Sequence, residues 1–233
     1  MYDGTVSGTT LKNLVNPGTY DGTITGSPTI VANKFGVLKG IQFDGVDDYI
    51  NTNIGITKPT RCALIVLFKT PGNKGGFLFT NASSSSYQNS FTIGLNASNG
   101  NISAYFHLSS NNGADGKYTS GGVYNNGIYC IAGVRNGDTA SDHDIFINGI
   151  KQGFTLILSS EGATHTAGTP SGWYIGAYSA YNNIVNVSMD SNIELYTWVY
   201  FDVAKSDAEV AAISKLLLNK PIQNPNNLRA WWA

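Results

Sequence analysis

The sequence predicts an all-β domain of two packed antiparallel sheets, with one short helix near its C-terminal end. Charged residues make up only 12% of the 233 residues, whereas glycine is abundant, with 27. Exposed helix faces normally carry Lys and Glu, so this composition favours many short strands joined by tight turns. Single β domains often reach about 200–250 residues. The hydrophobic share of 42% is enough for a sizeable core, and the length fits one domain.

The stretch from Asn33 to Asn51 is predicted to be strand, tight corner and strand. Apolar and polar residues alternate before the corner, as in a half-buried strand. Asp44-Gly45 then interrupts the strand, because Asp bonds local backbone groups and Gly tolerates positive φ. Tyr49-Ile50 resumes an extended run. The corner holds Asp44, Asp47 and Asp48. We interpret these carboxylates as solvated or backbone-bonded turn residues, with a metal site as the alternative.

Further strand-like runs follow in order. Residues 61–70 (RCALIVLFKT) are apolar on both alternating faces, which predicts a strand in the middle of a sheet. Asn148-Gly149 is the dipeptide that most strongly favours a tight hairpin. Residues 109–122 are predicted to form a long polar loop. The other expected strands are residues 77–80, 91–95, 102–108, 128–134, 144–147, 150–154, 173–177 and 195–201.

One helix is expected after the last strand. Ser206 and Glu209 have the spacing of a capping box, and apolar residues then recur at helical spacing. Pro221 ends the helix. Residues 1–220 are therefore expected to form the domain and residues 221–233 a tail. The tail carries Trp231-Trp232, which we expect to dock either on this domain or on a partner.

Several segments resemble laminin-G-like jelly rolls of the concanavalin A-like lectin/glucanase superfamily. FGVLKGIQFDGVDDYIN is similar to that family's "F…l.FDGvDDYV" signature. IYCIAGVRNGD…DIFINGIKQG resembles its "WhhvAgvrdG…lYvNGvl.G" hairpin, and YFDVAKSDAEVAAISKLL resembles its closing strand and helix. The resemblance covers roughly residues 11–219 in the expected order. It implies a two-sheet antiparallel jelly-roll sandwich.

Composition excludes several classes of function. The net charge is −1 and no basic patch appears, so no nucleic acid is expected as a partner. No apolar run approaches the roughly 20 residues that cross a bilayer, so no membrane insertion is expected. The N-terminal residues lack the features of a signal peptide, which predicts synthesis in the cytoplasm without export. Cys62 and Cys130 lie in apolar runs and are expected to be buried free thiols.

The sequence predicts that the protein is not an enzyme. Glycosidases normally use two carboxylates across the scissile bond, and the E-x-D-x-E strand of jelly-roll hydrolases is absent. Of the glutamates, Glu161 is expected in a loop, Glu209 caps the helix and Glu194 stands alone. In Asp142-His143-Asp144 the acids would face away from the His in an extended chain. A glycoside hydrolase of the same fold remains the less favoured alternative.

The resemblance implies a calcium site at the rim of the sandwich, built by the opening loop and the strand before the helix. Asn13 stands where the family often has Asp, and residues 195–199 lack the family's acids. The family site therefore looks degraded, and no cofactor is expected to be required. Calcium at Asp44, Asp47 and Asp48 remains an alternative.

Binding is the function that remains. Sugar sites combine aromatic faces with amides and carboxylates, and tyrosines occur in loops rich in Asn and Ser. The candidate ligand-binding residues are Tyr87, Tyr118, Tyr124, Tyr178 and Tyr181. Stand-alone versions without a signal resemble those of phages and prophages. The predicted function is a non-catalytic virion protein, for capsid decoration or the tail, with lectin-like glycan binding; a dedicated lectin module is the alternative. Expected partners are virion proteins, a second copy bound through Trp231 and Trp232, and cell-surface glycans.

Overall fold

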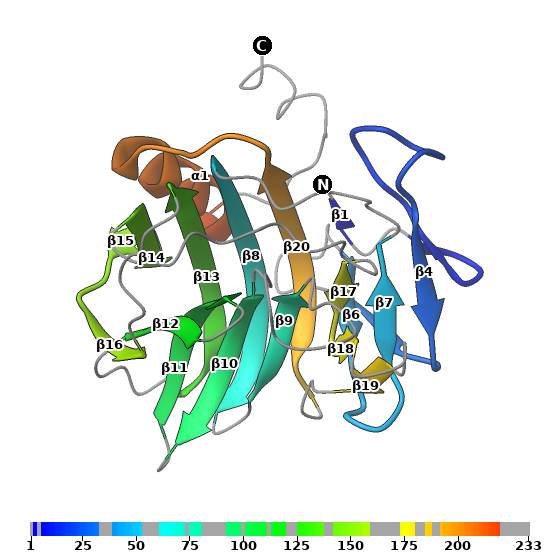
Figure 1. Ribbon diagram of the computed structural model, residues 1–233. Helices are drawn as coiled ribbons and strands as arrows, with labels where there is room; N and C mark the ends of the chain where they lie inside the picture. Colours follow the sequence, from blue (N-terminus) through cyan, green and yellow to red (C-terminus); the bar gives the residue numbers. More distant parts are fainter. Residues whose placement is uncertain are drawn as a thin grey trace.

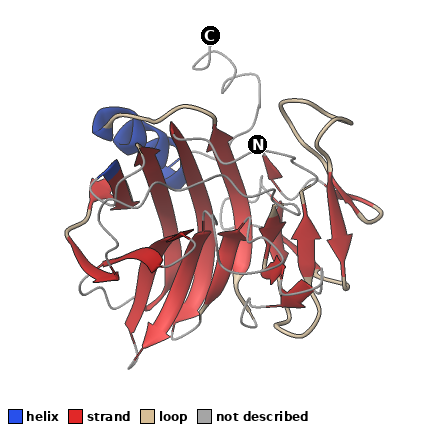
Figure 2. Ribbon diagram, in the orientation of Figure 1, coloured by secondary structure: helices blue, strands red, loops and turns tan. Residues whose placement is uncertain are grey.

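Two antiparallel sheets pack face to face in the computed structural model of the chain, and one helix covers part of the outside (Figures 1 and 2). The structure describes residues 2–3, 6–32, 39–52, 61–72, 75–80, 92–98, 101–110, 113–119, 125–137, 142–158, 173–179, 185–187 and 192–219. Within them the fold is the predicted two-sheet jelly-roll sandwich. None of the described helices has the length and apolar character needed to cross a membrane.

Each sheet is built from strands that are distant in sequence. Sheet A runs in the order β15 (Ile150–Lys151), β14 (His143–Ile147), β13 (Asn125–Asn136), β8 (Arg61–Gly72), β20 (Glu194–Phe201), β6 (Lys39–Gln42) and β5 (Thr29–Ala32), and β1 (Tyr2–Asp3) also pairs with β20. Sheet B runs in the order β16 (Phe154–Leu158), β12 (Gly113–Thr119), β11 (Asn101–Ser110), β10 (Thr92–Ser98), β9 (Gly76–Thr80), β17 (Tyr174–Ile175), β7 (Tyr49–Asn51), β4 (Gly22–Thr25), β3 (Thr10–Leu11) and β2 (Val6–Ser7). A separate pair joins β18 (Ala177–Ser179) to β19 (Val185–Val187).

Strand β8 is buried on both faces, as its double apolar pattern predicts. Its inward residues, such as Leu64, Val66 and Phe68, join the core between the sheets. The residues between them, such as Ile65 and Leu67, belong to a second core on the outer face of sheet A. Helix α1 (Asp207–Asn219) covers that face, where its residues Val210 and Leu217 are buried. The helix is therefore what keeps water off the outer side of the central strand.

The helix begins as the capping box predicts. The Ser206 backbone N–H donates to Glu209 Oε2 at 2.8 Å, and the Glu209 N–H donates to Ser206 Oγ at 3.4 Å. These bonds satisfy amides that have no partner within the helix. The expected helix is confirmed, and Asn219 is its last residue.

The Asn148-Gly149 hairpin is confirmed, and it lies under the helix. Asn148 adopts a φ of 53°, and its Oδ1 accepts a 2.9 Å hydrogen bond from the Cys130 N–H. Its own N–H donates to the Cys130 carbonyl at 2.7 Å. Gly149 has a φ of 80°, and a Cβ there would lie 3.0 Å from the Ala211 Cα. The turn thus joins β13 to the helix as well as reversing the chain.

The two cysteines are buried and neither forms a disulfide, as predicted. They also lie too far apart to pair. Cys62 opposes Arg135 across the β8–β13 ladder, whereas Cys130 opposes Leu67. They point to opposite faces of sheet A, because Cys62 joins the inner core and Cys130 the outer one. Burial raises the pKa of the Cys130 thiol to about 12.

The predicted polar loop over residues 109–122 is wrong in its middle part. Residues 113–119 form β12, which pairs with β11 on one side and β16 on the other. Its sequence, GADGKYT, has little β propensity of its own. Hydrogen bonding along both edges holds it in the sheet, and this support is not visible in the local sequence.

Candidate functional site

The segment between β6 and β7, residues 44–48, forms an acidic turn that we call the Asp corner. It lies at the end of the sandwich where β18 and β19 also lie (Figure 1). Phe43, just before it, is 1% exposed. The Phe43 N–H donates to the Ile193 carbonyl at 3.1 Å, and the Phe43 carbonyl accepts from the Asn192 N–H at 3.0 Å. The corner is therefore anchored to the segment that leads into β20.

Asp48 joins the Asp corner to the link between β4 and β5. Its side chain is 1% exposed, and Oδ1 accepts from the Ser27 N–H at 2.8 Å while Oδ2 accepts from the Asp44 N–H at 2.9 Å. Gly26 has a φ of 80° and no room for a Cβ, because Asp48 Oδ1 occupies that position. Burial raises the pKa of Asp48; these amides oppose the shift, and the charges of Asp44 and Asp47 add to it. Asp48 is thus a buried structural carboxylate.

Asp44 and Asp47 are exposed on the same turn. Asp44 Oδ1 accepts from the Val46 N–H at 2.7 Å and from the Asp47 N–H at 3.4 Å. The bond from Val46 is the main reason that the pKa of Asp44 lies below its ordinary value. One carboxylate oxygen from each of Asp44, Asp47 and Asp48 lies within 4.8 Å of the other two. Two of the three carboxylates bond the backbone, and a metal site here stays a prediction.

The opening loop does not have the carboxylate that the family calcium site implies. Asn13 Oδ1 accepts instead from the Val15 N–H at 2.9 Å and the Asn16 N–H at 3.2 Å. Asp21 Oδ1 accepts from the Asn13 and Gly18 amides at 2.9 and 3.1 Å, so both side chains organise the loop. Residues 195–199 of β20 are all buried, and all of them except Thr197 belong to the two cores. At these two places the side chains serve the loop and the cores, and the degraded calcium site stays a prediction.

The contacts of Asp21 predict a loss of stability in acid. The Lys12 ammonium, 2.8 Å from Oδ2, together with the Asn13 and Gly18 amides, lowers the pKa of Asp21 from 3.8 to about 2. Because the folded pKa is the lower one, this stabilisation is present above the unfolded pKa and disappears as the pH falls toward 2. We expect urea unfolding to show a decline between about pH 4 and pH 2 that is shallower in Asp21→Asn. Asp202→Asn, which changes an exposed aspartate outside this loop, is the control. Equal slopes for all three proteins would contradict the assignment.

The predicted tyrosines do not come together in the described part of the chain. Tyr178 lies in β18 opposite Asn186, and Tyr118 lies in β12 opposite Tyr105, so both are in strands where loops were predicted. Cross-strand pairing explains the difference, because neither run has a strong strand pattern of its own. The remaining candidates, Tyr87, Tyr124, Tyr181, Trp231 and Trp232, lie outside the described residues.

Of the two described candidates, Tyr178 is the one whose strand lies near the Asp corner. Strand β18 begins directly after Gly176, which has a φ of 81°. A Cβ at Gly176 would lie 2.9 Å from the Phe43 ring and 3.3 Å from the Asp48 carbonyl. The backbone of β18 therefore starts in contact with the Asp corner. Strand β12, which carries Tyr118, lies toward the opposite edge of sheet B.

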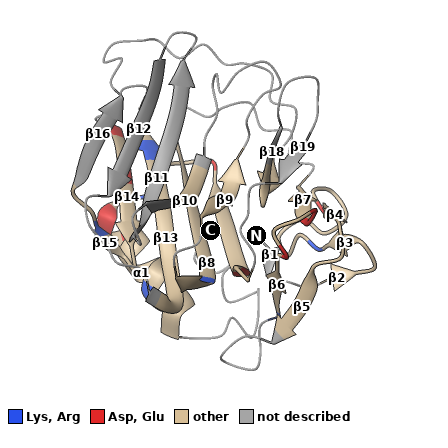
Figure 3. Cartoon of the chain, turned by 90° about the horizontal axis from the view of Figure 1, so that it is seen from below, with Lys and Arg blue, Asp and Glu red and all other residues tan. Residues whose placement is uncertain are grey.

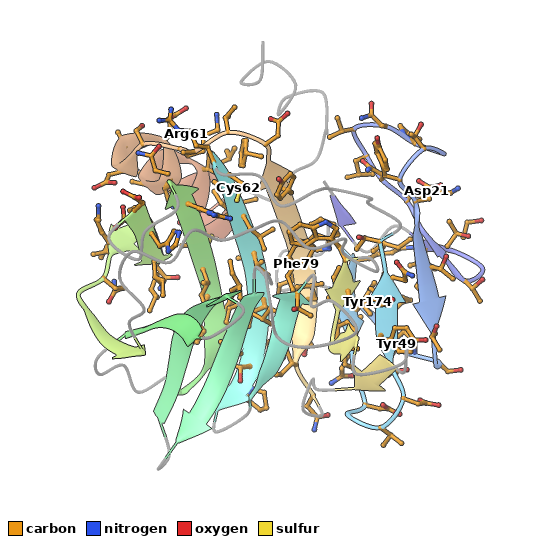
Figure 4. The ribbon with its side chains drawn as sticks, in the orientation of Figure 1. Asp21, Tyr49, Arg61, Cys62, Phe79 and Tyr174 are labelled. Atoms are coloured by element: carbon orange, nitrogen blue, oxygen red, sulfur yellow. The ribbon has the colours of Figure 1, made fainter. Side chains whose placement is uncertain are left out.

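Sequence reasoning missed a tyrosine pair beside the Asp corner. The rings of Tyr49 and Tyr174 lie on neighbouring strands with centroids 6.3 Å apart, tilted by 59° (Figure 4). Tyr49 is half-buried and Tyr174 is buried. Asn51 lies opposite Tyr174 in the ladder. The sequence does place Tyr49 directly after Asp48, which could have pointed to this pair. A tyrosine at the start of a strand is also an ordinary β residue, however, so its position alone did not mark a site.

The glutamates that the structure describes have structural roles. Glu194 Oε1 lies 2.6 Å from Lys69 Nζ, and Oε2 accepts a 2.6 Å hydrogen bond from the Tyr196 hydroxyl. Burial, and then the Glu194 carboxylate, raise the pKa of Tyr196 well above its ordinary range. Glu209 caps the helix. The third glutamate, Glu161, lies outside the described residues.

The Asp142-His143-Asp144 run has the alternation that the sequence predicts. His143 is 1% exposed and opposes Arg135 in the ladder. Asp144 belongs to the other face of β14, where its Oδ2 lies 2.8 Å from Lys151 Nζ. The two side chains therefore do not form an acid–base pair.

Comparisons with known proteins identify the fold. The binding domain of Paraclostridial Mosquitocidal Protein 1 matches 92% of this chain and 51% of its own, with 14% identity and a TM-score of 0.67. A heptameric SAP-like pentraxin from Limulus polyphemus matches 72% of this chain and 75% of its own, with 16% identity and a TM-score of 0.52. A Trypanosoma rangeli sialidase matches 91% of this chain and 32% of its own, with 13% identity and a TM-score of 0.52.

The chain thus spans about half the length of the first of these proteins. At these identities the likeness shows a shared two-sheet sandwich fold and nothing finer. No protein-family model matches the sequence, and no curated protein matches it at the sequence level.

Proposed function

We propose that the chain is a non-catalytic binding module that recognises glycans at the Asp corner. The observation that carries this proposal is the rigid placement of two exposed carboxylates beside a tyrosine pair. Asp44 and Asp47 are exposed on a turn fixed by Asp48, and Tyr49 follows on β7. Carboxylates accept hydrogen bonds from sugar hydroxyls, and tyrosine rings pack against the apolar faces of pyranoses.

Two further observations support a binding role over catalysis. Glu194 and Glu209 are engaged by Lys69, Tyr196 and Ser206, so neither is available as a free acid or base across a glycosidic bond. Similar solved structures include a toxin binding domain and a pentraxin, although a sialidase is also among them. A glycoside hydrolase of the same fold is the alternative that an activity assay must address.

The laminin-G-like resemblance and its phage-type relatives extend the proposal to a virion protein, for capsid decoration or the tail. In that setting the partners are other virion proteins, a second copy bound through Trp231-Trp232, and glycans of the host cell surface. Comparison of the full chain with one that ends at residue 225 tests the tail. Assembly that is lost on truncation would support the tail as an assembly element, and equal behaviour of the two chains would contradict it.

A glycan array followed by titration of the best glycan tests the binding site. We expect Asp47→Asn to weaken binding roughly tenfold, because a charge-assisted hydrogen bond to a hydroxyl is lost. Asp202→Asn, which changes an exposed aspartate next to the helix, is the matched control and should bind like the wild type. Absence of binding to any glycan, or equal binding by both variants, would reject this site. Turnover of a polysaccharide would favour the hydrolase instead.

We also propose that binding does not require calcium. We expect calcium or EDTA to change the melting temperature by less than about 1 °C, because ligands stabilise only what they bind. Scanning calorimetry of the wild type and of Asp47→Asn measures this. A calcium-dependent rise of several degrees that Asp47→Asn removes would instead assign a metal site to the Asp corner.

A further inference from the structure

Strand β5 is a hydrogen-bonding edge without charge. Among the described residues it pairs with β6 alone, so its other side is the margin of sheet A (Figure 3). Its sequence is Thr29-Ile30-Val31-Ala32. Thr29 is exposed, and Ile30 is 41% exposed although its ladder partner Ile41 is buried. An uncharged edge with an exposed apolar side chain is a template for pairing with another strand.

The opposite edge of sheet A is protected. Strand β15 there has only two residues, and one of them is Lys151. Lys151 Nζ lies 2.8 Å from Asp144 Oδ2 and 3.4 Å from Asp207 Oδ2, which holds a charge network across the edge. Short edge strands and edge lysines are the usual means of preventing strand addition. The β5 and β15 edges of sheet A therefore differ, and of these two only β5 is open to pairing in the described part of the chain.

The start of β5 is held in place before any partner arrives. Pro28 precedes the strand, and the Ser27 N–H is bonded to Asp48 Oδ1. Gly26, at a φ of 80°, packs against Asp48 in the same link. A pre-ordered edge loses little conformational entropy on pairing, which favours association.

We propose that two copies of this chain associate through β5, pairing antiparallel about a two-fold axis so that sheet A continues from one copy into the other. Opposed residues of an antiparallel pair have their side chains on the same face of the sheet. The two-fold axis therefore passes midway between the two copies of one residue, which oppose each other. Centring it on Ile30 opposes Ile30 with its own copy and Thr29 with Val31. No like charges meet, and the exposed Ile30 side chain becomes buried. This surface is distinct from the C-terminal tail.

The asymmetry of the edges fixes the type of assembly. Pairing of β5 with the opposite edge of its own sheet would build a filament, and at β15 the Lys151 network opposes this. Self-pairing of β5 uses the same surface on both copies and closes at the dimer. A four-residue edge buries little area, so we expect a weak dimer with a dissociation constant between about 10 µM and about 1 mM.

Sedimentation velocity of the full chain over that concentration range tests the proposal. We expect a dimer to appear with concentration and Ile30→Lys to raise its dissociation constant roughly tenfold or more, because two lysines would oppose each other at the axis. Ile150→Lys is the matched control, because Ile150 is a 69% exposed isoleucine on the opposite edge of the same sheet. It should dimerise like the wild type.

Three outcomes would overturn the proposal. One is a monomer over the whole concentration range. Another is a dimer that Ile30→Lys leaves intact, which would assign association to another surface such as the tail. The third is equal weakening by both lysine variants, which would indicate an effect of charge rather than of this edge. Circular dichroism of each variant establishes that the fold is retained.

Discussion

Substitution of Gly149 by alanine is expected to lower the free energy of unfolding by about 3 kcal/mol, through left-handed backbone strain and overpacking. The residue has a φ of 80°, and its Cβ would lie 3.0 Å from the Ala211 Cα and 3.2 Å from the Ser214 Cβ. Both neighbours belong to α1, so either the helix must move or the turn must open. Urea unfolding, followed by circular dichroism, measures the loss.

Gly153→Ala is the matched control for this prediction. It lies just beyond the same hairpin, its φ is outside the left-handed region, and a Cβ there meets no atom within 4 Å. We expect a change within about 0.5 kcal/mol. Similar losses in the two variants would mean that the contact between hairpin and helix is not what limits stability.

Asp48→Ala is expected to destabilise the fold by about 3 kcal/mol, because it removes a buried carboxylate and leaves its two partly buried backbone donors without an acceptor. These are the Ser27 and Asp44 N–H groups, both of which now bond the Asp48 carboxylate at under 3 Å. The control is Asp47→Ala, which removes an exposed carboxylate from the same turn. We expect it to stay within about 0.5 kcal/mol of the wild type. Equal effects at both positions would contradict the structural role of Asp48.

The difference in stability between the wild type and Asp48→Ala is expected to depend on pH. Burial raises the pKa of Asp48 above that in the unfolded chain, so the folded state holds its proton to higher pH. The stabilisation linked to this proton is complete below the unfolded pKa and declines as the pH rises through the folded pKa. We therefore expect this difference in the free energy of unfolding to narrow as the pH rises from the unfolded pKa of Asp48 to its folded pKa. A difference that widens instead would show that the pKa is lowered.

Most of the fold could be predicted because its signals are local. The apolar run of β8, the Asn148-Gly149 turn and the Ser206–Glu209 capping box each specify their own backbone, and all three are found. Strand β12 could not be predicted, because it depends on neighbours on both sides. The same reason explains why Tyr118 and Tyr178 were expected in loops.

The Asp corner could be located from the sequence, but its three acids could not be told apart. Asp48 differs from Asp44 and Asp47 because Gly26 and Ser27, from another strand connection, enclose its side chain. The tyrosine pair was missed for a related reason. Tyr174 reaches Tyr49 only because β17 pairs with β7. Contacts between residues distant in sequence thus determine which side chains are buried and which stay available to a ligand.

The order of strands in sheet A also determines when the protein can fold. Strand β8 lies between β13 and β20, and β20 pairs in turn with β1 at the start of the chain through Tyr2 and Trp198. These contacts have high sequence separation, so loop closure must precede most of the stabilisation and folding is expected to be slow. A ribosome-bound chain that ends before residue 194 still lacks β20. One edge of β8, the most apolar strand, then has no partner strand. Sheet A is therefore completed only after most of the chain has left the ribosome.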